Sequence, residues 1–215
     1  MGKALIPRTS DLQAAWRPAA TIILVLIATV ITLRLEGRIW YCECGSWELW
    51  KSSVWSSHCS QHVSDPYTIS HISHGLLFWC LFHWLFDRLG PRRFPAVAAR
   101  ITTPWRLALS VFVAAVWEIA ENSTWVIERY RTVTMSLDYM GDSVTNATCD
   151  VLFCALGFYV AQWLKLTGTL LLFAAFEVIL LVTIRDNLTL NVIMLLTPIE
   201  AIKQWQMAGH APVGG

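Results

Sequence analysis

The chain has 215 residues, of which 55% are hydrophobic and only 14% are charged. A soluble globular domain carries about 25% charged residues, so this composition excludes an ordinary soluble protein and favours a multipass membrane protein. The formal net charge of +1 gives no basis for a nucleic-acid partner, and we expect membrane lipids to surround the chain. The length allows a single membrane domain over residues 1–215 with short loops.

Six apolar runs predict an all-α, polytopic bundle of about six transmembrane helices. They cover residues 19–35, 70–88, 105–124, 142–163, 168–184 and 188–202. The sixth run is the weakest, because Asn187 and Asn191 lie at its start, Pro198 interrupts it, and a span needs about 20 residues. We therefore expect the sixth segment to be short or re-entrant, and residues 36–69 to form an outer loop.

The charges between the runs predict the orientation of the chain. With the N-terminus inside, six Lys and Arg residues fall outside and ten inside, namely Lys3, Arg8, Arg17, Arg88, Arg92, Arg93, Arg100, Arg106, Lys165 and Lys203. Because cytoplasmic loops carry the excess of Lys and Arg, we predict that both termini are cytoplasmic. No small-residue cleavage site follows the first run, so we interpret it as an uncleaved signal anchor.

The predicted outer loop contains three cysteines, Cys42, Cys44 and Cys59, together with His58 and His62. Three interpretations stay open. A disulfide from Cys59 to Cys42 or Cys44 suits an oxidising compartment, and free thiols suit a reducing one. The histidines allow a zinc site, although Cys-Glu-Cys is not a standard zinc spacing.

Polar side chains recur at one depth on three of the predicted spans. These side chains are His71 and His74 on the second span, Glu118, Glu121 and Asn122 on the third, and Asp142, Asn146 and Asp150 on the fourth. Spacings of three or four residues put each set on one helix face, and the predicted topology puts all of them in the outer half of the membrane. Because ionisable groups in a bilayer are costly unless paired or hydrated, they predict an outward-facing polar site.

Residue chemistry suggests roles for these side chains. His74 is the candidate general acid/base, Glu118 and Asp150 are the candidate second acid/base groups, and Arg185 is a candidate anion-binding group. The other candidate binding residues are His71, Glu121, Asn122, Asp142 and Asn146. A divalent metal is a further option, with His71, His74, Glu118 and Asp150 as its ligands, although Glu-x-x-His and His-Glu-x-x-His motifs are absent.

Structural explanations compete with these roles. Asp142 immediately precedes a predicted helix and suits an N-cap or first-turn acid. Asn146 suits a hydrogen bond between helices, and Glu177, alone in the fifth span, suits a paired structural acid. Glu118 and Asp150 resist such explanations because they are charged, deep and flanked by apolar residues.

Four strings carry a resemblance to known proteins: DPYTISHISHG at 65–75, WEIAEN at 117–122, YMGDSVTN at 139–146 and RDNLTLN at 185–191. They resemble an uncharacterised family of small bacterial multipass membrane proteins with a placeholder name of the UPF type, which implies an inner-membrane location. A second set of residues is similar to VanZ-like proteins over about residues 71–160, namely His74, Glu118, Asp142, Asn146 and Gly157. The Asp-Lys pair that usually precedes the histidine in VanZ-like proteins is absent here.

Three hypotheses for the function follow. The first is an enzyme or binding protein whose outward-facing site takes a lipid or a cell-envelope precursor. The second is a small transporter or proton relay, for which 215 residues without an inverted repeat would require a homo-oligomer. The third is a non-catalytic subunit of a larger membrane complex, in which the polar residues fix helix packing.

Overall fold

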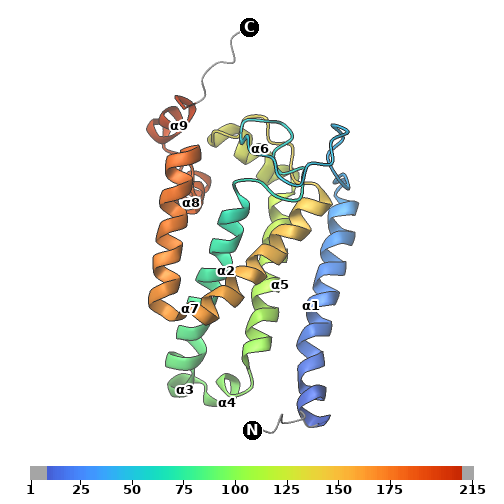
Figure 1. Cartoon of the computed structure of the whole chain (residues 1–215), viewed down its shortest axis with the longest axis vertical. Coiled ribbons are helices and arrows are strands. Elements are labelled where there is room, and N and C mark those ends of the chain that lie inside the picture. The colour runs from blue at the N-terminus through green and yellow to red at the C-terminus, as the bar shows by residue number, and fades with distance from the viewer. Residues whose placement is uncertain (1–8, 210–215) are drawn as a thin grey trace, which may run out of the picture.

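The computed structural model describes residues 9–209, with side chains from Trp16 onward, as helices joined by loops (Figure 1). The helices are α1 (Thr9–Leu35), α2 (Thr68–His83), the π-helical segment η1 (Trp84–Leu89), α3 (Gly90–Arg93), α4 (Pro95–Ala98), α5 (Thr103–Glu121), α6 (Thr124–Val133), α7 (Val144–Ile184), α8 (Leu188–Leu196) and α9 (Glu200–Met207). Within residues 9–209 the only extended pairing is one isolated bridge between Trp50 and Ser64. The predicted all-α class is therefore confirmed.

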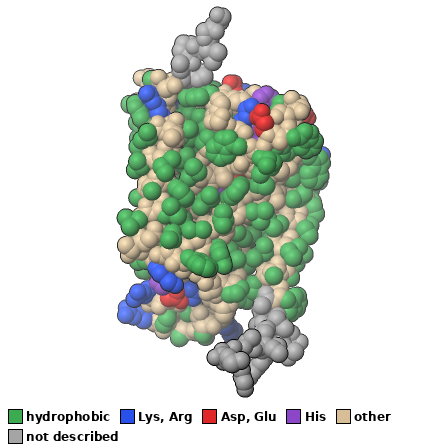
Figure 2. Space-filling view, in the orientation of Figure 1, with side chains coloured by type: hydrophobic (Ala, Val, Ile, Leu, Met, Phe, Trp, Pro, Cys, Tyr) green, Lys and Arg blue, Asp and Glu red, His purple; other side chains and the backbone are tan. Residues whose placement is uncertain are grey.

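Four of the described helices are long and apolar enough to cross a membrane: α1, α2 with its continuation through α3, α5 and α7. Large apolar side chains such as Leu24, Ile27 and Leu171 are exposed along them. Figure 2 shows apolar side chains over the middle of the visible face and charged side chains gathered toward its two ends. Because so large an apolar surface is rare in soluble monomers, the pattern indicates helices that face lipid.

Helix α7 consists of two segments that meet at Lys165. This residue has a non-helical backbone, with φ 58° and ψ −177°. The hydroxyl of Thr169 donates to the carbonyl of Ala161 at 3.3 Å, although eight residues of continuous helix would separate these groups by about 12 Å. The chain therefore reverses direction at Lys165 (Figure 1), and the two segments correspond to the fourth and fifth predicted spans.

Helices α2 and α7 cross closely at two glycines. A Cβ atom added to Gly75 would overlap the carbonyl of Cys154, and one added to Gly157 would overlap the carbonyl of Ile72. Only glycine permits this approach of two helix backbones. The crossing places the turn before Gly75 beside the turns before Gly157, and these turns carry the polar residues of the two helices.

Two short helices replace the sixth predicted span. Helix α8 has nine residues and is about 14 Å long, less than half of the roughly 30 Å hydrocarbon core. Glu177, within α7, accepts hydrogen bonds from the backbone N–H groups of Leu188 at 3.1 Å and Thr189 at 3.0 Å. Helix α8 therefore begins beside the interior of α7, as expected for a short segment, and Glu177 is the paired structural acid that was predicted.

The two described ends of the chain lie at opposite ends of the bundle. Helix α1 begins at the lower end of Figure 1, whereas α9 lies at the upper end. Helices α1, α2 and α5 run along the bundle, whereas the two segments of α7 turn back above the level of α3 and α4 (Figure 1). Helix α8, with nine residues, is too short to span a membrane by itself, and the prediction that both termini are cytoplasmic stays a prediction.

Loops cover the upper end of the bundle (Figure 1). Residues 36–67 connect α1 to α2, and residues 134–143 connect α6 to α7. The two loops are joined by a hydrogen bond from the N–H of Ser143 to the carbonyl of Ser60 at 2.9 Å, and by one from the Gln61 amide to the carbonyl of Gly141. They form the roof of the polar site.

Candidate functional site

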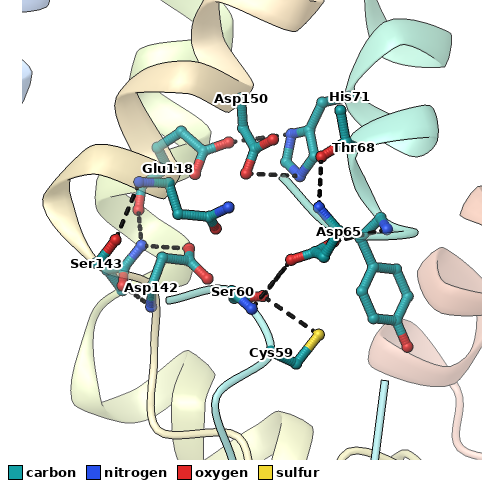
Figure 3. Close-up of polar contacts among 12 residues, drawn as sticks. Cys59, Ser60, Asp65, Thr68, His71, Glu118, Asp142, Ser143 and Asp150 are labelled. Atoms are coloured by element: carbon teal, nitrogen blue, oxygen red, sulfur yellow. Dashed lines mark hydrogen bonds and ion pairs between the residues drawn. The ribbon is translucent and has the colours of Figure 1, made fainter. Parts of the chain in front are cut away.

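His71 lies between two buried carboxylates that come from different helices. Its Nδ1 atom is 3.1 Å from Oε1 of Glu118 on α5, and its Nε2 atom is 3.8 Å from Oδ2 of Asp150 on α7 (Figure 3). Glu118 is 1% exposed and Asp150 is 4% exposed. Each ring nitrogen thus faces an acid, and an imidazole in this position can exchange protons with either carboxyl group.

His74 is one turn further along α2 and contacts aromatic rings. Its ring is edge-on to that of His71, with 5.6 Å between centroids, and is stacked on Phe78 at 6.2 Å. The ion pairs with Glu118 and Asp150 in the described part of the chain involve His71 and not His74. The contacts expected for the general acid/base therefore belong to His71, because the rotation of α2 turns that residue toward α5 and α7.

Asn122 and Asp142 bind each other at the upper edge of the site. Nδ2 of Asn122 donates to Oδ2 of Asp142, and the N–H of Asp142 donates to Oδ1 of Asn122, both at 2.7 Å. The Tyr139 hydroxyl donates to Oδ1 of Asp142 at 2.9 Å. Burial raises the pKa of Asp142, although the hydrogen bonds from Asn122 and Tyr139 oppose this shift. Asp142 is not the N-cap of α7, since Ser143 accepts from the N–H of Asn146 at 3.0 Å.

Asp65 closes the site from the loop before α2 and was not among the predicted site residues. Its Oδ2 accepts from the N–H of Ser60 at 3.0 Å, and its Oδ1 accepts from the N–H of Tyr67 at 2.7 Å (Figure 3). Burial raises the pKa of Asp65. Its position in the sequence could have identified it, because it is an acid just ahead of the helix that carries both histidines.

Several buried polar atoms of the site have no hydrogen-bond partner within residues 9–209. They are Oε1 of Glu118, which makes only the ion-pair contact with His71, Oε2 of Glu121, Oδ1 of Asp150, and both amide atoms of Asn146. Buried polar atoms are rarely left unpaired. Their concentration here indicates a place that binds water, an ion or a polar ligand.

A cavity of about 290 Å³ lies beside these groups. Its polar lining includes His71, His74, Glu121, Asp142 and Asp150. Its apolar and aromatic lining includes Trp55, Trp117, Tyr130, Leu137, Val192 and Leu195. Ligand sites combine apolar walls with a few convergent polar groups, and this volume suits a small head group with part of an attached chain.

Three carboxylates of the site could hold a cation. One oxygen each from Glu118, Glu121 and Asp142 lies within 4.8 Å of the other two. Carboxylate oxygens are ligands for hard cations such as Mg²⁺ and Ca²⁺. This group shares only Glu118 with the predicted metal ligands His71, His74, Glu118 and Asp150.

Arg185 lies outside the cavity lining, although it was predicted to bind an anion at the site. Its guanidinium donates to the carbonyl of Trp205 at 3.0 Å and lies 5.6 Å from the centroid of that ring. The neighbouring Asp186 is buried and accepts from the Tyr67 hydroxyl at 3.1 Å and from Gln206 at 3.0 Å. Burial raises the pKa of Asp186 to about 6. The contacts of Arg185 therefore join α7 to α9 instead of serving the site.

Cys42, Cys44 and Cys59 are unbridged in the structure, and the disulfide from Cys59 to Cys42 or Cys44 stays a prediction. The sulfur of Cys42 is 3.3 Å from Nδ1 of His58, and the sulfur of Cys44 is 3.7 Å from Nε2 of His62. The sulfur of Cys59 instead accepts a contact of 4.0 Å from the Ser60 hydroxyl.

Comparison with known proteins gives a consistent result over most of the chain. Residues 33–208 match the family described as "Protein of unknown function (DUF2585)". A UPF0314 protein of Brucella anthropi is 46% identical over 192 residues, which cover 89% of this chain and 91% of that protein. UPF0314 proteins of Paracoccus denitrificans and Sphingopyxis alaskensis are 44% and 42% identical, over 86% and 92% of this chain and 90% and 97% of theirs. No solved structure matches the chain.

The resemblance to a UPF-type family is therefore confirmed. The matched region contains every candidate residue of the polar site, from Asp65 on the roof to Asp150 on α7. It also contains the cysteines and histidines of the outer loop. The chain belongs to the DUF2585 family, and the relatives described above carry the name UPF0314.

Proposed function

We propose that this protein is a multipass protein of the bacterial inner membrane that binds and processes a lipid or a cell-envelope precursor in an outward-facing site. The observation that carries the proposal is the position of His71 between Glu118 and Asp150, beside a cavity with polar and apolar walls. The polar groups suit a head group, and the apolar side chains suit the chain attached to it.

The proposed chemistry is general acid–base catalysis by His71. A hydroxyl group or water bound in the cavity would transfer its proton to the imidazole. The facing carboxylate, Glu118 or Asp150, would stabilise the resulting imidazolium, and a leaving group would take the proton back. His74, which lines the same cavity, would support the ring of His71 and contact the substrate.

The charge of the site narrows the class of substrate. Glu118, Glu121, Asp142 and Asp150 lie close together, and none of them has an ion pair with Lys or Arg within residues 9–209. An anionic head group would be repelled by unpaired carboxylates. We therefore expect a neutral, hydroxyl-rich or cationic head group, or an anionic one that enters together with a divalent cation.

The orientation is part of the proposal and rests on the charge at the lower end of the bundle. The segment from α3 to the start of α5 carries Arg92, Arg93, Arg100 and Arg106. An excess of Lys and Arg in short loops favours the cytoplasmic side. The site is at the opposite end, below the loops 36–67 and 134–143, so it would face the periplasm.

A proton relay is the second candidate function, and one observation favours it. Oδ1 of Asp150 is buried without a hydrogen-bond partner within the described residues, while its Oδ2 faces His71. A chain of an acid, a histidine and a second acid can conduct protons. In that case the cavity would hold water instead of a substrate.

Mass spectrometry of the protein purified in mild detergent tests the proposal. We expect wild type and His83→Gln to carry the same bound amphiphile, and His71→Gln and Glu118→Gln to lose at least about nine-tenths of it, because a buried polar contact contributes more than about 1.4 kcal/mol. His83 is the matched control, since it pairs with Asp87 at 2.7 Å near the other end of α2. Absence of a bound amphiphile, together with proton flux in liposomes that Glu118→Gln abolishes, would instead support the relay.

A further inference from the structure

Two cysteines and two histidines converge in the outer loop, in a cluster that the candidate site does not use. The sulfur of Cys42 is 3.3 Å from Nδ1 of His58, and that of Cys44 is 3.7 Å from Nε2 of His62. Ligand atoms of Cys42, Cys44 and His62 all lie within 4.8 Å of one another. The cluster thus joins residues 42–44 to residues 58–62 across the loop.

These distances match the edges of a tetrahedral metal site. With Zn–S bonds of about 2.3 Å and Zn–N bonds of about 2.0–2.1 Å, the edge between a sulfur and a nitrogen is about 3.6 Å long. The two observed sulfur–nitrogen distances, 3.3 Å and 3.7 Å, are close to that value. Cys42, Cys44 and His62 would need little movement to share one ion, and His58, which contacts the sulfur of Cys42 but lies outside this group of three, would have to move toward it.

The orientation of His62 is already that of a metal ligand. Its Nδ1 lies 2.8 Å from the carbonyl of Glu48, which can only accept a hydrogen bond, so Nδ1 carries the proton. The lone pair of Nε2 is then directed toward Cys44. Metal-binding histidines commonly donate their second N–H to a carbonyl or carboxylate, which fixes the tautomer and the ring orientation.

Two of the four side chains are buried and two are exposed. His62 is 1% exposed and Cys42 is 8% exposed, Cys44 and His58 are exposed, and the N–H of Cys42 donates to the carbonyl of Gln61 at 3.0 Å. The loop around the cluster contains no described helix and no strand, so it has little regular structure of its own.

We propose that Cys42, Cys44, His58 and His62 bind one zinc ion as a closed, four-coordinate structural site. Two thiolates and two imidazoles are a common ligand set for structural zinc, and a hard cation such as Mg²⁺ would prefer oxygen ligands. The ion would cross-link the loop whose Val54, Trp55 and Ser60 line the cavity. Cys59 is not a ligand, because its sulfur faces Ser60.

Metal analysis of the whole protein tests this proposal directly. The protein is purified in detergent with neither a metal-affinity step nor a chelator, under mildly reducing conditions. We expect about one zinc per chain in wild type and in Cys59→Ser, and at least about a tenfold loss in Cys42→Ser and in His62→Asn, because a four-ligand site tolerates no missing ligand well. Cys59→Ser is the matched control because it removes a thiol from the same loop.

A second measurement on the wild-type protein keeps the test independent of whether the variants fold. A chelator should expose two further thiols to alkylation, and peptide mapping should assign them to Cys42 and Cys44. Replacement of zinc by Co²⁺ should give the visible absorption of a tetrahedral site with thiolate ligands. Three results would each overturn the assignment: no bound metal after incubation with Zn²⁺, copper in place of zinc, or a disulfide that includes Cys42 or Cys44.

Discussion

Asn122 and Asp142 are joined by two hydrogen bonds of 2.7 Å, one in each direction. Asn122 caps the C-terminal end of α5, which carries Glu118, and Asp142 precedes α7, which carries Asp150. Nδ2 of Asn122 also donates to the carbonyl of Glu118 at 3.0 Å. This pair therefore fixes the positions of the two acids on either side of His71.

Replacing Asn122 by Ala should lower the free energy of unfolding by about 3 kcal/mol, because it leaves buried polar atoms of Asp142 without partners. Gln204→Ala removes an exposed amide and should change the free energy of unfolding by less than about 0.5 kcal/mol. Unfolding in mixed micelles of detergent and SDS measures both values. Equal losses for the two variants would show that the pair does not stabilise the fold.

Gly75→Ala and Gly157→Ala should each destabilise the protein by about 3 kcal/mol, because the added methyl group meets a backbone carbonyl that cannot move without separating α2 from α7. Gly168→Ala is the control, since its methyl group would meet only the Leu164 side chain, at 3.1 Å. That change should alter stability by less than about 1 kcal/mol. Thermal unfolding in detergent compares the stabilities of the three variants with that of the wild type. A stable Gly75→Ala protein would contradict the close crossing.

Asp186 should make the protein less stable as the pH rises. Its folded-state pKa of about 6 is above the ordinary value of 3.8, so the folded state holds more protons between about pH 4 and pH 6. The free energy of unfolding therefore falls across this window, by up to about 3 kcal/mol for this group, and levels off above it. The pH dependence of the melting temperature should flatten in Asp186→Asn and stay unchanged in the exposed control Glu128→Gln. If the melting temperature of Asp186→Asn depended on pH as steeply as that of the wild type, Asp186 would not be the group responsible.

The two ends of the described chain should lie on opposite sides of the membrane. Alkaline phosphatase, which is active only in the periplasm, is fused after residue 93, 133 or 209. We expect activity after 133 and 209, because α6 and α9 share the upper end of the bundle, and no activity after 93, which follows two arginines. An inactive fusion after residue 209 would instead support the topology with both termini in the cytoplasm. Activity after 93 would reverse the orientation of the proposed site.

The sequence alone determined the all-α class and pointed to most of the polar residues that line the candidate site, but not to Asp65. Apolar runs predicted the helices because helix formation and burial in lipid depend on local composition and length. The spacing of Asp142, Asn146 and Asp150 predicted a polar helix face for the same reason. Glu177 was read correctly as a paired acid, since a single charge in an apolar run requires a partner.

Only the tertiary structure decided which of these residues meet. His71 and His74 are three residues apart, and the crossing of α2 and α7 at Gly75 and Gly157 determines which ring contacts the acids. The reversal at Lys165 and the convergence of the outer-loop cysteines and histidines also depend on contacts between segments far apart in the chain. Residue spacing places side chains on one helix or loop, whereas the distances between helices and loops follow from how the whole chain packs.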